Sequence, residues 1–183
     1  LRWGDPHTNG LAGLWHMNDL ATVDGSAIAD ASLHAHPSVL ETAEGSGVGK
    51  TVYAKLGQGL DFDGLDDVVE VADAPAFDIA TSSVTLMAWI RPRAFGPIAS
   101  HADGVTPGDG WVFGVNAAGA LRMSLGGFDP DGAGTVTLDE WTHVAVVLDG
   151  DRVQFYLDGM LDRVVLRQGS LTDSNAALTI VRD

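Results

Sequence analysis

Hydrophobic and polar residues alternate with a period of two in successive short runs along the chain. The runs are rich in β-branched and aromatic residues, and Gly, Asp, Asn or Pro stands between them, a pattern typical of antiparallel all-β proteins. The number of predicted strands is larger than one open twisted sheet comfortably holds. The pattern therefore predicts an antiparallel two-sheet β-sandwich. The clearest runs of strand length are 13–17, 59–62, 68–71, 84–91, 111–116, 120–125, 141–148, 153–157 and 161–166.

Two turn dipeptides connect the later runs. Asp149-Gly150 and Asp158-Gly159 lie between predicted strands, and Asp-Gly accepts the positive φ values of tight hairpin turns. They predict a three-stranded meander over residues 141–166. A second hairpin is expected to join residues 111–116 to residues 120–125.

Two of the runs are apolar on both faces. Alternate positions on either face of residues 84–91 and 141–148 are largely apolar, so we expect both strands to lie inside a sheet. Trp15, Trp89 and Trp141 stand in the strongest runs and are assigned to the core.

The regular pattern covers only part of the chain. Residues 18–58 are rich in Ala, Ser, Gly and Asp and are interpreted as a long loop with one or two short strands. We expect residues 1–10 to be a linker or the tail of a preceding domain, and residues 11–183 to form one domain.

Composition restricts the classes of protein. A chain of 183 residues with 45% hydrophobic residues suits one domain, and no run of 18 apolar residues suggests a membrane-spanning helix. The formal net charge of −15 would repel nucleic acid and anionic lipid, so no nucleic-acid partner and no membrane insertion is expected. Without cysteine, the fold depends on packing, aided by an ion where one binds.

An acidic loop is the main candidate for a metal site. Asp61, Asp63, Asp66 and Asp67 fall within seven residues around a glycine, and a hard cation that takes six to eight oxygen ligands would relieve their repulsion. Calcium fits this set better than magnesium, with Asp30 as a candidate ligand from a distant segment. The alternative is a solvated Asp-Gly turn.

Two further polar loops could line a ligand site. Asp129 and Asp131 flank a proline in one loop, and Asp103 and Asp109 precede Trp111 in the other. Loops at the end of a sandwich often carry binding, and aspartates beside an aromatic ring suit sugars, which stack and need hydrogen-bond acceptors. Simple turn formation is the alternative for both loops.

No catalytic residue is assigned. The chain has no cysteine nucleophile, no Gly-x-Ser-x-Gly motif and no His-Glu-x-x-His motif. A glycoside hydrolase needs two carboxylates on a rigid cleft, and the predicted strands carry almost no acids. The glycine-rich segment 45–51 lacks the first glycine of a phosphate-binding loop.

Several segments in order resemble the laminin-G-like, concanavalin A-like jelly-roll family, in its bacterial three-motif form. They are Leu-Trp-His-Met at 14–17, Gly-Gln-Gly-Leu-Asp-Phe-Asp-Gly-Leu-Asp-Asp at 57–67, Thr-Leu-Met-Ala-Trp-Ile-Arg-Pro at 85–92, Trp-Thr-His-Val-Ala at 141–145 and Phe-Tyr-Leu-Asp-Gly at 155–159. The resemblance implies a jelly roll used for binding or adhesion in secreted or surface proteins, often with bound calcium. Residues 61–67, and Asp30 less securely, match the part associated with that ion.

The chain departs from this family at its end. Members usually close with a Gly-x-Ile-Asp-Glu-Val strand, and none occurs before Asp183. We therefore expect the closing strand to be missing from these residues, or to be complemented by a neighbouring domain or chain, because an unpaired edge invites pairing.

Three functional hypotheses follow. The first is a noncatalytic, calcium-assisted binding or adhesion module of an extracellular bacterial protein, with carbohydrate or a cell-surface glycan as ligand. The second is a protein–protein or architectural module. The third is a glycoside hydrolase-like enzyme.

Overall fold

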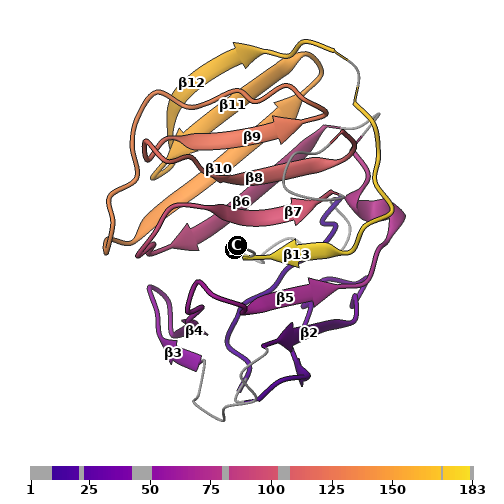
Figure 1. Cartoon of the computed structure of the whole chain (residues 1–183), viewed down its shortest axis with the longest axis vertical. Helices are drawn as coiled ribbons and strands as arrows, with labels where there is room; N and C mark the ends of the chain where they lie inside the picture. The colour runs from indigo at the N-terminus through magenta and orange to yellow at the C-terminus, as the bar shows by residue number, and fades with distance from the viewer. Residues whose placement is uncertain are drawn as a thin grey trace, which may run out of the picture.

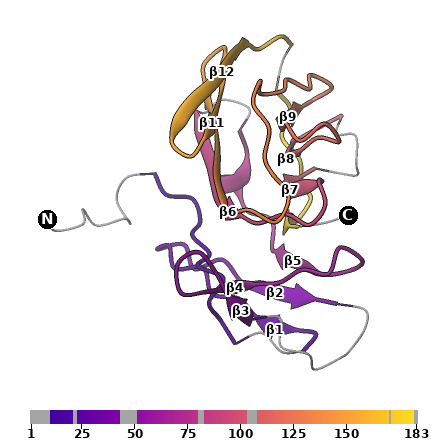
Figure 2. The ribbon, with the colours of Figure 1, turned by 90° about the vertical axis from the view of Figure 1, so that its left-hand side faces the viewer.

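The computed structural model describes residues 10–20, 23–42, 51–79, 83–102, 108–169 and 171–181. In these ranges it confirms the all-β prediction, since every strand pair is antiparallel and a single 3₁₀ turn, η1 (Pro75–Phe77), is the one helical element. Figures 1 and 2 show two sheets stacked face to face. No helix among the described residues has the length and apolarity needed to cross a bilayer.

The larger sheet has seven strands. Its strand order mixes early and late segments of the chain, as a jelly roll requires. In spatial order its strands are β1 (Ser26–Ala27), β2 (Ser38–Glu41), β5 (Val68–Val71), β13 (Leu178–Ile180), β7 (Pro97–His101), β8 (Trp111–Val115) and β9 (Leu121–Leu125).

The smaller sheet has four strands, and a separate two-stranded hairpin lies beside it. Its strands in spatial order are β12 (Met160–Leu166), β11 (Arg152–Leu157), β10 (Thr142–Asp149) and β6 (Val84–Ile90). The hairpin is formed by β3 (Thr51–Tyr53) and β4 (Gln58–Leu60). The predicted meander over 141–166 and the hairpin of β8 with β9 are both confirmed.

The core lies between the inner faces of the two sheets. Alternation places one side chain in two toward the partner sheet, and each large apolar side chain buried there contributes about 1.5–3 kcal/mol. The core side chains that are almost completely buried include Val144, Val146, Leu148, Val153 and Phe155 of the smaller sheet and Val69, Val71, Phe113, Leu121, Met123 and Leu125 of the larger one.

One prediction of strand position is correct and one is wrong. β10 lies between β11 and β6, as expected for an interior strand. In contrast, β6 is the last strand of its sheet among the described residues, and Met87 and Trp89 on its outer face are exposed. A second apolar face therefore does not mean a second neighbouring strand here. Trp89 is not a core residue.

Other differences concern the first third of the chain. Residues 13–17 form no strand but a single bridge between Trp15 and Asp30, although Trp15 packs against the core. The described part of the region 18–58 contains three complete strands and not one or two. The pattern missed β7 and β13, which have five and three residues. The predicted linker lies, except for Gly10, outside the described residues.

The same substitution on opposite faces of the smaller sheet tests this architecture. Val146 of β10 is 1% exposed, and Val164 of β12 is 44% exposed. Val146→Ala should lower the free energy of unfolding by about 2 kcal/mol through lost burial and a cavity. Val164→Ala should change it by less than about 0.5 kcal/mol. Urea unfolding followed by tryptophan fluorescence measures both, and equal losses would contradict the assignment of faces.

Candidate functional site

The acidic loop predicted from the sequence connects β4 to β5 at the rim of the fold. Gly64 has a φ of +77°, a conformation that glycine adopts without strain. The N–H of Leu65 donates to Asp63 Oδ1 over 2.9 Å, and the N–H of Asp63 donates to Asp67 Oδ2 over 2.9 Å. These local hydrogen bonds fold the loop so that its later aspartates lie beside its first.

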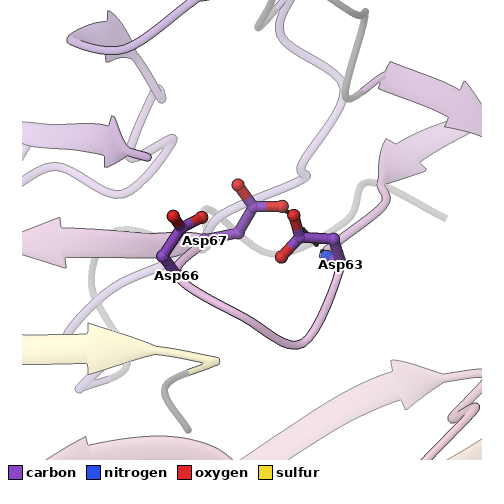
Figure 3. A group of neighbouring side chains, drawn as sticks. All are labelled: Asp63, Asp66 and Asp67. Atoms are coloured by element: carbon purple, nitrogen blue, oxygen red, sulfur yellow. Dashed lines mark hydrogen bonds between the residues drawn. The ribbon is translucent and has the colours of Figure 1, made fainter. Parts of the chain in front are cut away.

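Three carboxylates converge in this loop. Asp63, Asp66 and Asp67 each contribute one oxygen, and these oxygens lie within 4.8 Å of one another. Figure 3 shows the carboxyl group of Asp67 between those of Asp66 and Asp63. Asp63 is exposed, Asp66 is half-buried, and Asp67 is only 5% exposed. We call Asp63, Asp66 and Asp67 the Asp triad.

Calcium fits the Asp triad. The Oδ1 atom of Asp66 is buried and has no hydrogen-bond partner among the described residues, which is costly unless a ligand satisfies it. Calcium accepts carboxylate and carbonyl oxygens in flexible geometry. The triad supplies part of the six to eight oxygens that calcium takes, so carbonyl groups or water would complete the set.

Asp61 lies outside the triad because an arginine holds it. Arg93, two residues beyond Arg91 at the end of β6, contacts Asp61 Oδ1 over 2.7 Å and donates to the carbonyl oxygen of Phe62 over 2.8 Å. The hydrogen bond with Asp61 and its negative charge raise the pKa of Arg93. The pair ties the acidic loop to the smaller sheet.

Asp30 is occupied by the backbone of its own region. Its carboxylate accepts hydrogen bonds from the N–H groups of Leu14, Ser32 and His36 and from the hydroxyl of Ser32. Burial acts to raise the pKa of Asp30, but these hydrogen bonds outweigh it and the pKa is lowered. Asp30 therefore anchors the N-terminal segment and is not part of the triad.

Of the two other predicted loops, the one before β8 does not expose its tryptophan. Trp111 is 3% exposed, and its indole N–H donates to the carbonyl oxygen of Phe77, so its ring has no open face for stacking. Asp109 and Asp129 are exposed. Asp103 lies outside the described residues.

Asp131 forms a two-bond pair with Arg122. The Nε atom of Arg122 donates to Asp131 Oδ1 over 2.7 Å, and a terminal nitrogen donates to Oδ2 over 2.9 Å. This pairing is the main cause of the lowered pKa of Asp131. The carboxylate serves the fold, because it holds the loop after β9 against that strand.

Trp89, which the sequence pattern assigns to the core, is an exposed aromatic ring. It is 40% exposed on the outer face of β6. The ring of His143 lies 5.3 Å away edge-on, and Lys55 Nζ lies 4.9 Å from the indole centroid. Lys55 belongs to the β3–β4 hairpin, which leads directly into the acidic loop. Arg93, shortly after β6, binds Asp61 in that loop. Trp89 of β6 and the acidic loop therefore lie at the same end of the fold.

Sequence reasoning also missed a polar pair between a buried histidine and a more exposed aspartate. His101 of β7 is fully buried, with Nε2 3.0 Å from Asp73 Oδ1 and Nδ1 without a partner among the described residues. Asp78 lies nearby, and burial, followed by the charge of Asp173, raises its pKa. The absence of a recognisable run around β7 left no signal for this group.

The chain belongs to the concanavalin A-like lectin/glucanases superfamily. The Laminin_G_3 family model with that description matches residues 62–183, which confirms the resemblance noted from the sequence. No curated protein matches the chain by sequence.

Solved structures share the fold at low sequence identity. Domain 4 of AbnA, a GH43 extracellular arabinanase from Geobacillus stearothermophilus, was solved with arabinotriose. It superposes with a TM-score of 0.57 and 15% identity over 88% of this chain and 84% of that one. The binding domain of botulinum neurotoxin serotype G superposes with a TM-score of 0.59 and 10% sequence identity. The match covers 87% of this chain and 41% of the toxin chain. Trypanosoma rangeli sialidase superposes with a TM-score of 0.56 and 14% sequence identity. The match covers 92% of this chain and 26% of the sialidase chain.

The Arg122–Asp131 pair predicts a pH-dependent stability. A carboxylate with a lowered folded pKa stabilises the fold above its unfolded pKa of about 3.9, and this contribution disappears as the pH falls through the folded value. Asp131→Asn should lower the free energy of unfolding at pH 7 by about 0.5–1 kcal/mol, because both side chains are partly exposed.

Urea unfolding of both proteins between pH 7 and about pH 2 measures this difference, which should shrink toward zero in acid. Asp129→Asn, the same change two residues earlier at an exposed position, is the control and should have little effect. A difference that stays constant with pH would show that the charge of Asp131 is not its cause.

Proposed function

We propose that the protein is a noncatalytic, calcium-assisted binding module of an extracellular bacterial protein, with carbohydrate as its ligand. The observation that carries this proposal is the convergence of the Asp triad at the rim of a concanavalin A-like sandwich, with the buried Asp66 Oδ1 unpaired among the described residues. Extracellular placement is supported by the structurally similar arabinanase domain, which comes from an extracellular enzyme.

Calcium would determine the shape of the acidic loop. Three carboxylates this close repel one another, and Arg93, which contacts the loop, is engaged by Asp61 and by the carbonyl oxygen of Phe62. A divalent ion held by Asp63, Asp66 and Asp67 removes the repulsion and fixes the loop against β5. A fixed loop binds a ligand with a smaller entropy loss than a free one.

Carbohydrate is supported by the exposed aromatic ring at the same end. Trp89 offers an apolar surface for the faces of a sugar, with Lys55 and His143 beside it as polar groups. The similar arabinanase domain was solved with arabinotriose. The proposed ligand surface therefore moves from Trp111 to Trp89 and the adjoining acidic loop.

We assign no bond-breaking role to the triad. Glycoside hydrolysis needs two carboxyl groups that face each other across the scissile bond, about 5–10 Å apart. The oxygens of Asp63, Asp66 and Asp67 lie within 4.8 Å on a single loop, an arrangement suited to holding a cation.

Calcium should raise the melting temperature of the protein. An ion present at about a hundred times its dissociation constant adds about 2.7 kcal/mol to the stability of the folded form, or about 5–10 °C for a domain of this size. The measurement is a melting curve in calcium, in magnesium and in chelator. An identical midpoint in calcium and chelator would count against the site.

The matched variants are Asp66→Asn and Asp129→Asn. Asp66→Asn removes a triad charge with almost no change in shape and should abolish most of the calcium shift. Asp129→Asn makes the same change in another Asp-Gly loop and should keep the full shift. Loss of the shift in both variants would indicate a nonspecific effect of net charge.

Glycan binding should require both the ion and the tryptophan. On a glycan array that includes arabino-oligosaccharides, the wild type should bind in calcium and lose its signal in chelator. Trp89→Ala should weaken binding by about fivefold to a hundredfold, since stacking on one aromatic ring contributes about 1–3 kcal/mol. Leu166→Ala, at an exposed position on β12, is the control. Absence of binding in either condition would reject carbohydrate as the ligand class.

A further inference from the structure

The open edge of β6 differs from the other edges of the two sheets. β1 has only two residues. β12 carries Asp162 and Arg163 beside an irregularity in its register with β11, and bulges and charges are features that discourage pairing. β6 has seven residues, Val-Thr-Leu-Met-Ala-Trp-Ile, without a charge, a proline or a recorded bulge.

The edge of β9 is covered by the chain that follows it. The N–H of Met123 donates to the carbonyl of Pro130, and the N–H of Gly132 donates to the carbonyl of Leu121. Leu125 and Phe128 exchange hydrogen bonds in both directions. β6 is therefore the one long edge of the two main sheets that the described residues leave unprotected.

The register identifies the backbone groups at this edge. The N–H of Asp158 donates to the carbonyl of His143 over 2.8 Å, so the odd-numbered residues of β10 point their backbone groups toward β11. Because these directions alternate, the even-numbered residues of β10 face β6. Val144 pairs with Ala88, so the even-numbered residues of β6 face β10.

The backbone groups of Thr85, Met87 and Trp89 consequently point away from β10. No hydrogen bond from another described residue reaches their N–H or C=O groups. Three donors and three acceptors, evenly spaced on one strand, form a template for a further strand.

The side chains of β6 indicate that its inner face is also incomplete. Val84, Leu86, Ala88 and Ile90 pack against the core but remain only partly buried, whereas the inward residues of β10 next to them are almost fully buried. In Figures 1 and 2 the smaller sheet ends at β6, while the larger sheet continues past it through β5 and β2. An added strand would continue the smaller sheet toward the β3–β4 hairpin (Figure 2), whose Lys55 lies 4.9 Å from the Trp89 ring.

We propose that the edge of β6 binds an extended strand of a separate partner protein, with apolar side chains at alternate positions and a carboxylate at the end beside Arg91. Arg91 and Lys55 lie at this end of β6, and no described carboxylate forms an ion pair with either. A second copy of this chain is a poor occupant, because each copy carries a net charge of −15. This site shares Trp89 and Lys55 with the proposed carbohydrate surface, but it does not use the Asp triad and does not depend on calcium.

A synthetic peptide of nine residues, in which valine and threonine alternate between two terminal aspartates, is the probe. With its valines facing inward, its threonine N–H groups face β6. The peptide should bind the wild-type protein and raise its melting temperature. N-methylation of the threonines should weaken binding roughly tenfold or more, because it removes the donors to β6. N-methylation of the valines should change it by less than about threefold.

Two protein variants locate the binding. Met87→Pro removes an N–H that points away from β10, which an edge strand tolerates, and should abolish peptide binding. Met87→Thr removes the same side chain but keeps the backbone N–H, and this variant should still bind the peptide. Binding should be equal in calcium and chelator, so its failure and the failure of the calcium-dependent function are separate results.

Results from the peptides or from the oligomeric state of the protein could overturn the proposal. Equal binding of the two methylated peptides, or no binding of the unmodified peptide, would show that the β6 edge is not an acceptor. A wild-type dimer in light scattering that Met87→Pro converts to a monomer would place a second copy at the edge and exclude the separate partner.

Discussion

The burial of one apolar face on each sheet is the interaction on which the rest of the structure depends. The chain has no cysteine for a disulfide, so its stability must come from packing such as that of Phe155 in β11 and Phe113 in β8, both almost completely buried. This packing fixes the positions of strands from distant parts of the chain. The loops at the rim can then vary in sequence without changing the scaffold.

The acidic loop shows how this scaffold positions charged groups. Asp61 is held by Arg93, which follows β6, and the loop enters β5 directly after the buried Asp67. The two sheets thus anchor opposite ends of one short segment. The carboxylates between these anchors cannot separate freely, although their charges favour separation.

Local features of the sequence were predictable, and features that depend on distant pairing were not. The meander from β10 to β12 followed from alternation and two Asp-Gly turns, because both act within a few residues. The convergence of Asp63, Asp66 and Asp67 was expected for the same reason. The role of Asp30 was not, since its partners Leu14 and His36 come from the surrounding fold.

The tryptophans illustrate the same limit. Trp89 and Trp111 both lie in strongly apolar strands, and the alternation in either strand is compatible with two choices of inner face. The partner sheet makes the choice: it buries Trp111 and leaves Trp89 on the outside. Likewise, β6 and β10 have similar patterns, but only the order of strands in the sheet places one at the end and one in the interior.

The unequal edges of the smaller sheet also limit self-association. A fibre that grows by sheet extension needs two compatible edges on every molecule, so that each addition creates a new site for the next. In this sheet the irregular, charged edge of β12 stands opposite the regular edge of β6. A strand that pairs with β6 therefore creates no new edge on which a further molecule of this protein can add. The domain can expose the β6 edge without initiating polymerisation.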